Sequence, residues 1–175
     1  MKHLLHALAL MLIAACGDAP PATEAATAAD STTTSAVPVI DLSSHDLPLL
    51  LTPPDKQLTA GQDPSIVWKD ETGTLEIRAG EHFGLMIREE PGDIPRLKAS
   101  LERDLLKKNA VLRETPELLI YRSEFPDDPS LVFMHYCQVV HAGDRSFVVQ
   151  DVDDGTFNQQ DIERMMAAIS PKPPA

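Results

Sequence analysis

The sequence predicts a single α+β domain, a mostly antiparallel sheet of about six or seven strands packed with two helices. Three observations lead to this fold class. Several short segments between residues 47 and 151 alternate apolar and polar residues, which is typical of half-buried strands. Two segments, near residues 93–109 and 159–169, instead space their apolar residues three or four apart, as helices do. The connections are short and rich in Gly, Pro and Asp, so we expect one sheet with the helices laid against it.

Short apolar segments precede the first helix. Leu47–Leu51 is followed by two prolines, which favours a strand at the edge of a sheet. Residues 66–68 and 75–79 flank a glycine-containing turn, and the alternation within 75–79 indicates a strand with one buried face. The same period of two continues in residues 83–87, so these segments are expected to form neighbouring strands.

The first helix has clear signals at both ends. Asp93 is a good N-cap, and Pro95 is tolerated in the first turn because its missing N–H has no helical partner there. Lys107–Asn109 suits the C-terminus, where positive charge complements the helix dipole. The apolar stripe expected to face the sheet is Ile94, Leu97, Leu101 and Leu105.

The second half of the domain contains two predicted hairpins and a closing helix. Residues 111–113 and 118–125 flank Thr115-Pro116-Glu117, and residues 131–141 and 145–151 flank Ala142-Gly143. The last helix is expected at about residues 159–169. Its inward residues are Ile162, Met165, Met166 and Ile169.

The order of these elements resembles the Mog1/PsbP-like group of small domains. The first strand is marked by proline, and the closing helix ends in Met-Ala-Ala-Ile-Ser-Pro. The resemblance covers roughly residues 46–171, within a predicted domain over residues 39–171 that leaves residues 172–175 as a tail. That group includes photosystem assembly subunits, a nuclear transport factor and many bacterial lipoproteins. This sequence contains no motif onto which a functional residue of that group could be mapped.

The first sixteen residues predict export and a lipid anchor. Lys2 is followed by an apolar run over residues 4–15 and by small residues directly before Cys16, as in a secretory signal. The run is too short for a membrane span, which takes about 20 apolar residues. Ile13-Ala14-Ala15-Cys16 resembles the lipobox of bacterial lipoproteins. The resemblance implies removal of residues 1–15 and acylation of Cys16. A plain secreted protein is the alternative.

Residues 16–38 are expected to be a disordered tether. They consist almost entirely of Ala, Thr, Pro and Ser, and no large apolar side chain precedes Val37 to offset the entropy of ordering. A flexible coil of this length spans roughly 25 Å. Asp30-Ser31-Thr32 resembles the O-glycosylation triplet of some Bacteroidetes exported proteins, and a bare tether is the alternative. With Gly17 directly after the cysteine, the chain resembles outer-membrane lipoproteins. We therefore expect an outer-membrane anchor and a periplasmic domain.

Charge and cysteine content exclude several classes of function. Without residues 1–15 the chain carries 14 basic and 27 acidic side chains, a net charge of −13. Such a surface repels nucleic acid phosphates and anionic lipid. Cys137 is the only thiol besides Cys16, so the domain has no internal disulfide. The sequence has no phosphate-binding glycine loop, no His-Glu-x-x-His and no Gly-x-Ser-x-Gly, and we expect no cofactor.

One strand face carries the best candidate chemistry. A spacing of two puts His135, Cys137, Val139 and His141 on the same side, with Asp144, Ser146, Val148 and Gln150 expected opposite them. Imidazole and thiolate are ligands that zinc and copper prefer. However, His135 and His141 are six residues apart, about 20 Å along a strand, so one ion cannot bind both. A packed cysteine with two surface histidines explains the pattern without a metal.

Two other acidic or triad-like patterns are explained by local structure. Asp151-Val152-Asp153-Asp154-Gly155 has its glycine one place too early for a calcium loop, so it predicts an acidic turn before the last helix. Ser44-His45-Asp46 contains the residue types of a catalytic triad, but adjacent side chains point apart.

These observations predict a membrane-anchored bacterial lipoprotein with a small non-enzymatic domain that binds or scaffolds an envelope protein partner. Two alternatives stay open. One is a metal-handling or enzymatic protein that uses the His135/Cys137/His141 face. The other is a protein that binds a small ligand in a groove between helix and sheet.

Overall fold

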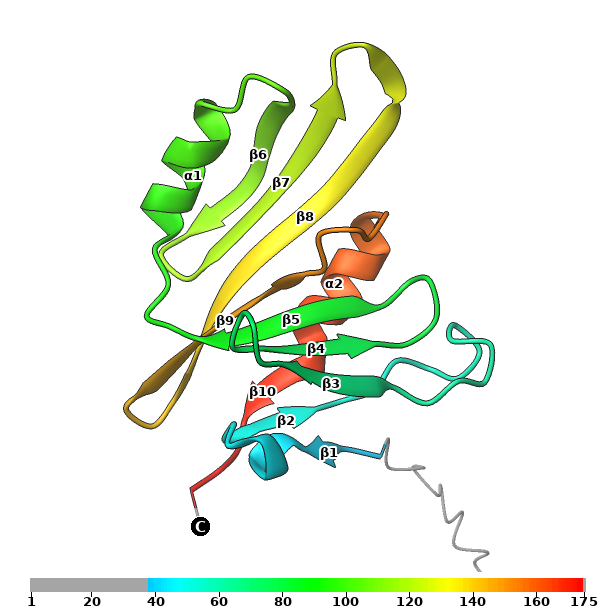
Figure 1. Ribbon diagram of the computed structural model, residues 1–175, viewed down its shortest axis with the longest axis vertical. Coiled ribbons are helices and arrows are strands. Elements are labelled where there is room, and N and C mark those ends of the chain that lie inside the picture. The colour runs from blue at the N-terminus through cyan, green and yellow to red at the C-terminus, as the bar shows by residue number, and fades with distance from the viewer. Residues whose placement is uncertain (1–37, 175) are drawn as a thin grey trace, which may run out of the picture. The chain divides into compact units, whose positions relative to one another are not determined.

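The computed structural model describes residues 38–174, and Figure 1 shows its helices and strands. The predicted signal peptide, Cys16 and all but the last residue of the predicted tether lie outside these residues. In chain order the elements are β1 (Ile40–Asp41), the 3-10 helix η1 (Leu42–His45), β2 (Leu49–Leu51), β3 (Ser65–Lys69), β4 (Thr74–Arg78), β5 (Gly84–Glu89), α1 (Ile94–Glu102), β6 (Lys108–Thr115), β7 (Leu118–Phe125), β8 (Asp128–Ala142), β9 (Arg145–Asp151), α2 (Gln159–Ala168) and β10 (Ile169–Pro171).

Seven strands form the main antiparallel sheet in the order β3-β4-β5-β9-β8-β7-β6. The longest strand, β8, pairs with β7 on one side and β9 on the other. The edge strand β6 carries a β-bulge between Val111 and Arg113, where its register with β7 shifts. The prediction of an α+β domain with a mostly antiparallel sheet is therefore confirmed.

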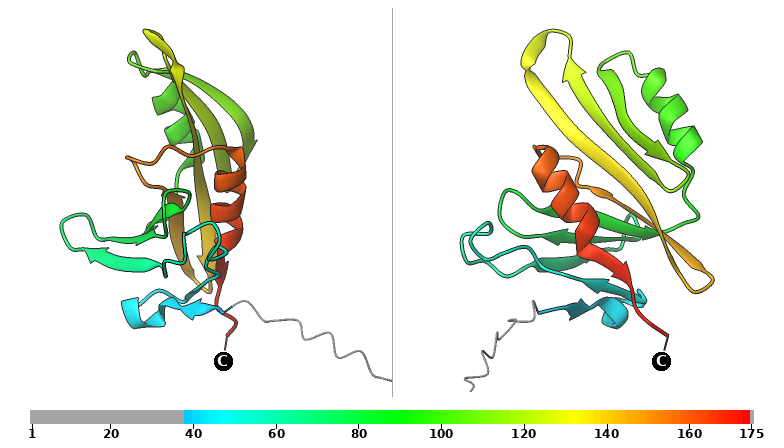
Figure 2. Two further views of the ribbon diagram at one scale, coloured as in Figure 1. Left: turned by 90° about the vertical axis from the view of Figure 1, so that its right-hand side faces the viewer. Right: turned by 180° about the vertical axis from the view of Figure 1, so that it is seen from behind.

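The two helices pack on opposite faces of this sheet, as the two views of Figure 2 show. Tyr136 and Val140 of β8 belong to the larger core, which includes Ile162 and Met165 of α2. Cys137 and Val139, whose side chains point to the other face of β8, belong to a smaller core with Ile94 of α1. Alternate residues of one strand thus contact different helices, because successive side chains of a strand point to opposite faces.

A second, three-stranded sheet was not predicted. It has the order β1-β2-β10 and joins both ends of the described chain. The segment predicted as a first strand over residues 47–51 contributes β2 to this sheet and not to the main one. Lys172, assigned to the tail from the sequence, donates its N–H to the Pro48 carbonyl and pairs its ammonium with Asp41. The two terminal strands are too short to show a periodic pattern, which is why the sequence did not reveal them.

The first helix ends earlier than predicted. It stops at Glu102, and Leu105, expected in the apolar stripe, is 95% exposed. The cause is Asp104, whose carboxylate accepts the backbone N–H groups of Leu106 and Lys107 and so offers the chain a turn in place of another helical turn. Lys108 begins β6, so the expected helix C-terminus at residues 107–109 is wrong.

Candidate functional site: a groove between α1 and the sheet

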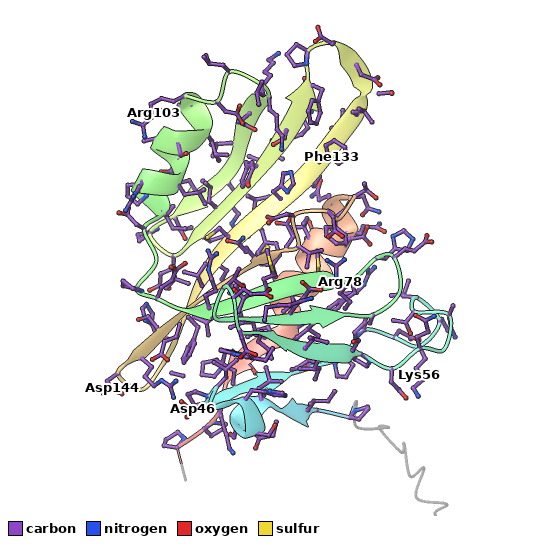
Figure 3. All side chains as sticks on the ribbon, viewed as in Figure 1. Asp46, Lys56, Arg78, Arg103, Phe133 and Asp144 are labelled. Carbon is purple, nitrogen blue, oxygen red and sulfur yellow. The ribbon has the colours of Figure 1, made fainter. Side chains whose placement is uncertain are left out.

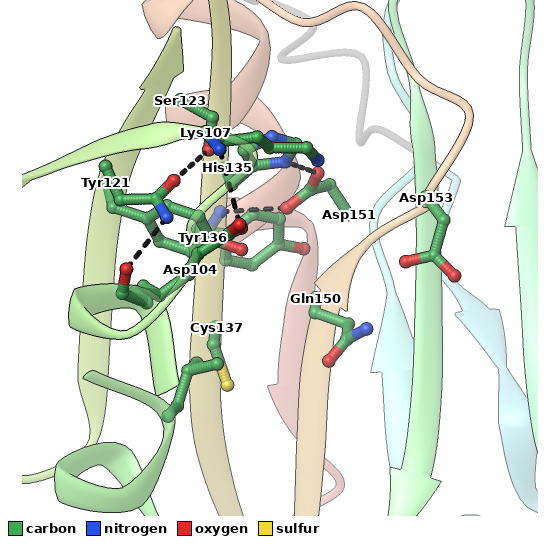
Figure 4. A pocket seen from close by; sticks show the side chains of 13 residues that line it. Asp104, Lys107, Tyr121, Ser123, His135, Tyr136, Cys137, Gln150, Asp151 and Asp153 are labelled. Carbon is green, nitrogen blue, oxygen red and sulfur yellow. Dashed lines mark hydrogen bonds and ion pairs between the residues drawn. The ribbon is translucent and has the colours of Figure 1, made fainter. Parts of the chain in front are cut away.

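A groove of about 320 Å³ lies between α1 and the sheet face that this helix covers (Figure 4). Ile94 is buried, but Leu97 and Leu101 are only partly buried, so the helix leaves open space over the sheet beyond its first turn. We call this space the α1 groove. Its lining residues are Leu97, Leu101, Asp104, Lys107, Asn109, Tyr121, Ser123, His135, Tyr136, Cys137, Gln150, Asp151 and Asp153.

One wall of the α1 groove holds a histidine–aspartate pair. His135 Nδ1 lies 2.7 Å from Asp151 Oδ2, and the backbone N–H of Tyr136 donates to Asp151 Oδ1 at 2.8 Å. Asp151 is buried, and the His135 side chain is only 13% exposed. Because both carboxylate oxygens have partners, Asp151 fixes the orientation of the imidazole and leaves Nε2 as the ring nitrogen that can meet a ligand.

The position of Asp151 follows from the end of the β8–β9 ladder. Cys137 is the last residue of β8 paired with β9, opposite Gln150. The next N–H along β8, that of Tyr136, would lack a ladder partner, and the Asp151 side chain supplies one. Asp151 still pairs with Leu85 of β5 through its backbone. The carboxylate therefore both completes the sheet and holds His135.

Aromatic rings enclose His135. The Tyr121 ring stacks on the imidazole with 5.0 Å between the centroids, and Phe133 lies 6.5 Å away on a tilted plane. Burial raises the pKa of the Tyr121 phenol well above its usual value, and the nearby charges of Asp151, Cys137 and Asp153 raise it further. Tyr121 is consequently a neutral hydroxyl at physiological pH.

Cys137 lies on the same strand face, two residues from His135. It is buried, and its burial, followed by the charge of Glu90, raises the pKa of the thiol to about 11. Cys137 also lines a second hollow of about 510 Å³, which shares Leu97 and Gln150 with the α1 groove and is bordered by Arg88 and Arg96. A thiol with this pKa is protonated at neutral pH, and the thiolate is the form that acts as nucleophile and metal ligand.

The mouth of the groove next to α1 is held by local hydrogen bonds. Ser123 Oγ donates to Asn109 Oδ1 at 2.6 Å, and the Asn109 amide donates to the Leu101 carbonyl at 3.0 Å. This chain of bonds connects β7 and β6 to the last turn of α1. The groove is therefore preformed around fixed polar groups, as is usual for small-molecule sites.

The three residues proposed from the sequence do not meet at one point. His135 and Cys137 line the α1 groove, while His141 lies outside it and is half exposed. The register confirms Ser146 opposite His141, Val148 opposite Val139 and Gln150 opposite Cys137. Asp144, expected in the same row, instead lies in the β8–β9 turn, at the far tip of this hairpin in Figure 3. The pairing of Ala142 with Arg145 leaves Gly143 and Asp144 as the turn residues.

His141 has its own neighbours at the surface. Its Nδ1 lies 2.9 Å from Ser146 Oγ, and its Nε2 lies 3.3 Å from a carboxylate oxygen of Glu117. These are the residue types of a serine hydrolase triad. His141 and Glu117 are nevertheless more than half exposed, and neither the α1 groove nor the second hollow includes any of the three residues. The arrangement therefore lacks the enclosed site in which such a triad acts.

The acidic segment after β9 distributes its carboxylates over different contacts. Asp151 holds His135, Asp153 lines the groove, and Asp154 pairs with Arg78 at 2.6 Å. Across residues 38–174, no group of three or more His, Cys, Asp or Glu is arranged to hold a metal ion.

Sequence reasoning missed Asp151 as the partner of His135. Counting by twos along β9 places Asp151 on the face of Tyr136, away from His135. Asp151 nevertheless reaches His135 because the β8–β9 ladder ends at Gln150, so the carboxylate can bond to the free N–H of Tyr136 at the edge of β8. The available signal was a carboxylate at the end of a strand whose centre is the apolar run Phe147–Val149.

No family model, curated protein or solved structure matches this chain. None of the described helices has both the length and the apolar character needed to cross a membrane. The resemblance to the Mog1/PsbP-like group stays a prediction.

Proposed function

We propose that this chain is a lipid-anchored protein of the bacterial cell envelope whose domain binds a small ligand in the α1 groove without transforming it. The observation that carries the proposal is the groove itself. It has a preformed volume of about 320 Å³, with Leu97 and Leu101 on the helix side and convergent polar groups around the fixed His135–Asp151 pair. Sites of this kind are the usual location of small-molecule binding.

Binding is favoured over catalysis by the state of the groups near His135. A histidine–aspartate pair is a possible general base, but covalent catalysis with it needs a side-chain nucleophile within hydrogen-bond reach. In the described part of the chain, the hydrogen-bond partner of the His135 side chain is Asp151. Cys137 has a pKa of about 11, and Ser123 donates its hydroxyl proton to Asn109. An envelope protein partner for the domain stays a prediction.

The anchor is proposed from the sequence at Cys16. Substitution of Cys16 by alanine should leave the protein with an unprocessed signal or release it from membranes. The physical reason is that the acidic chain has no other affinity for a lipid surface. The wild type should partition into the detergent phase of Triton X-114 and incorporate labelled palmitate. A mature protein that begins elsewhere than residue 16, or that stays aqueous and unlabelled, would refute the anchor.

The groove is tested by filling it. Leu101 lines the groove, and Leu101→Trp would place an indole in the open space, whereas Leu105→Trp adds the same ring at a fully exposed position nearby. The full-length wild type and both variants would be purified from membranes in mild detergent and denatured. Mass spectrometry would then identify the small molecules that each protein releases.

We expect the wild type and Leu105→Trp to release the same compound in near-stoichiometric amount and Leu101→Trp to release less than a tenth as much. Equal release from all three proteins, or no compound above background in the wild type, contradicts ligand binding in the groove. Circular dichroism of each variant establishes that it has folded.

A further inference from the structure

Two groups of the α1 groove that have no partner within the described residues, His135 Nε2 and the Asp153 carboxylate, can accept hydrogen bonds. In the tautomer whose Nδ1–H donates to Asp151, the imidazole of His135 presents the lone pair of Nε2. Asp153 lines the groove with an exposed carboxylate, and no hydrogen bond or ion pair of this side chain occurs among residues 38–174. A ligand that matches these groups must bring hydrogen-bond donors.

The charges around the groove are unbalanced in the same sense. Three carboxylates line it, those of Asp104, Asp151 and Asp153, against the single ammonium of Lys107. Lys107 Nζ lies 5.4 Å from the centre of the Phe125 ring, a side chain that is not part of the groove lining. The Lys107 ammonium thus has an aromatic partner, and the lining holds two more carboxylates than ammonium groups.

Nearby charges act on the pKa values of two residues that line the groove, Tyr121 and Cys137. After burial, the next causes that raise the pKa of Tyr121 include the charges of Asp151 and Asp153. At Cys137 the nearby charges oppose one another, because after burial Glu90 raises the pKa of the thiol, Arg88 lowers it and Asp151 raises it. The carboxylates of Asp151 and Asp153, which disfavour a phenolate at Tyr121, disfavour another anion at the same place.

We propose that the ligand of the α1 groove is a small organic cation with N–H donors, an amine or a guanidine compound. Its donors meet Asp153 and His135 Nε2, and its carbon chain lies against Leu97 and Leu101. The size of the groove, at the lower end of small-molecule sites, favours a compact ligand. This inference rests on the proposed function, since it names the chemical class that the groove accepts.

Three probes with the same four-carbon chain separate charge from shape: putrescine, 1,4-butanediol and succinate. Each would be titrated into the full-length protein in detergent at low salt, with calorimetry for the affinity and amide chemical shifts to locate binding. We expect putrescine to bind at least tenfold more tightly than butanediol, with shifts at Tyr121 and Cys137, and succinate to show no binding there. The dissociation constant of putrescine should rise with salt, because Asp153 is exposed and screened.

Matched variants locate the charge. Asp153→Asn removes a carboxylate from the groove, and Asp127→Asn removes one from the exposed turn between β7 and β8, outside the groove. The putrescine dissociation constant should rise at least fivefold in Asp153→Asn and change less than twofold in Asp127→Asn.

Equal losses in both variants would mean that putrescine responds only to the overall acidity of the protein, and would overturn the proposal. So would butanediol or succinate binding in the groove as tightly as putrescine, although the groove would then still be a ligand site. Absence of any groove shift with putrescine also overturns it. The proposed function is judged separately, by the compound released from the Leu101→Trp and Leu105→Trp variants.

Discussion

Gly92 is the residue at which a single methyl group should disturb the junction between the sheet and α1. It has φ +70°, a left-handed conformation that costs an L-residue about 1–2 kcal/mol. A Cβ placed there would lie 2.5 Å from Cγ2 of Val139 and 3.2 Å from Cγ2 of Val148, two buried residues of the α1 face. Both neighbours are β-branched and stiff, so they cannot rotate away freely, and overpacking of this kind costs about 1–3 kcal/mol.

Gly92→Ala should therefore lower the free energy of unfolding by about 2–5 kcal/mol. Gly143 provides a matched control, because its φ is +66° and a Cβ there would meet nothing within 4 Å. Gly143→Ala should cost only the backbone part, about 1–2 kcal/mol.

Urea unfolding of the full-length protein, followed by circular dichroism, measures both values. The dependence on urea should have the same slope in both variants if only the native state is affected. Equal losses of stability in the two variants, within about 0.5 kcal/mol, would refute the close contact between Gly92 and Val139.

Three further outcomes are expected. In the Cys16→Ala variant, Cys137 is the only thiol, and with a pKa of about 11 it should be roughly 0.1% ionised at pH 8, against roughly 10% for a thiol of pKa 9.0. Its alkylation by iodoacetamide at pH 8 should therefore be about 100-fold slower in the folded protein than in urea-unfolded protein, and the rate in the folded protein should rise about tenfold per pH unit. Equal alkylation rates in the folded and unfolded protein would contradict the burial of Cys137. Lys172 and Ser43 bond to the charged form of Asp41 and lower the pKa of its carboxyl from 3.8 to about 2. These bonds therefore contribute fully to stability above pH 3.8, and the contribution is lost as the pH falls through about 2. Carbon-13 NMR should show the Asp41 pKa returning toward 3.8 in Lys172→Gln, and an unchanged value would mean that the ion pair does not form. Ile94→Ala should cost about 2–4 kcal/mol in urea unfolding and Leu105→Ala less than about 0.5, and comparable losses would mean that α1 continues through Leu105.

The main sheet and the start of α1 could be predicted because local signals and tertiary contacts agree there. Asp93 does cap α1, accepting the N–H of Arg96 at 2.9 Å, and Pro95 does stand in the first turn. The β8–β9 hairpin has clean alternation, so the two faces of β8 were assigned correctly. In each case the pattern extends over enough residues to be counted.

The end of α1 and the partner of His135 could not be predicted, because each depends on one side chain that replaces a backbone partner. Asp104 bonds to the N–H groups that would otherwise continue toward a helix, and Asp151 bonds to the N–H at which the β8–β9 ladder stops. A side chain that takes the place of a backbone partner produces no periodic pattern in the sequence. The lipid anchor at Cys16 and the ligand of the α1 groove stay predictions.

The two edges of the main sheet differ in how well they resist aggregation. At one edge, the bulge of β6 after Val111 breaks the regular spacing of unpaired N–H and C=O groups, which hinders another strand from adding there. At the other edge, β3 pairs with β4 in unbroken register and exposes Val67 and Trp68. When many copies are crowded together, as on a membrane surface or in a concentrated sample, edge-to-edge association is expected at β3, and a charged residue at Val67 is the change that would suppress it.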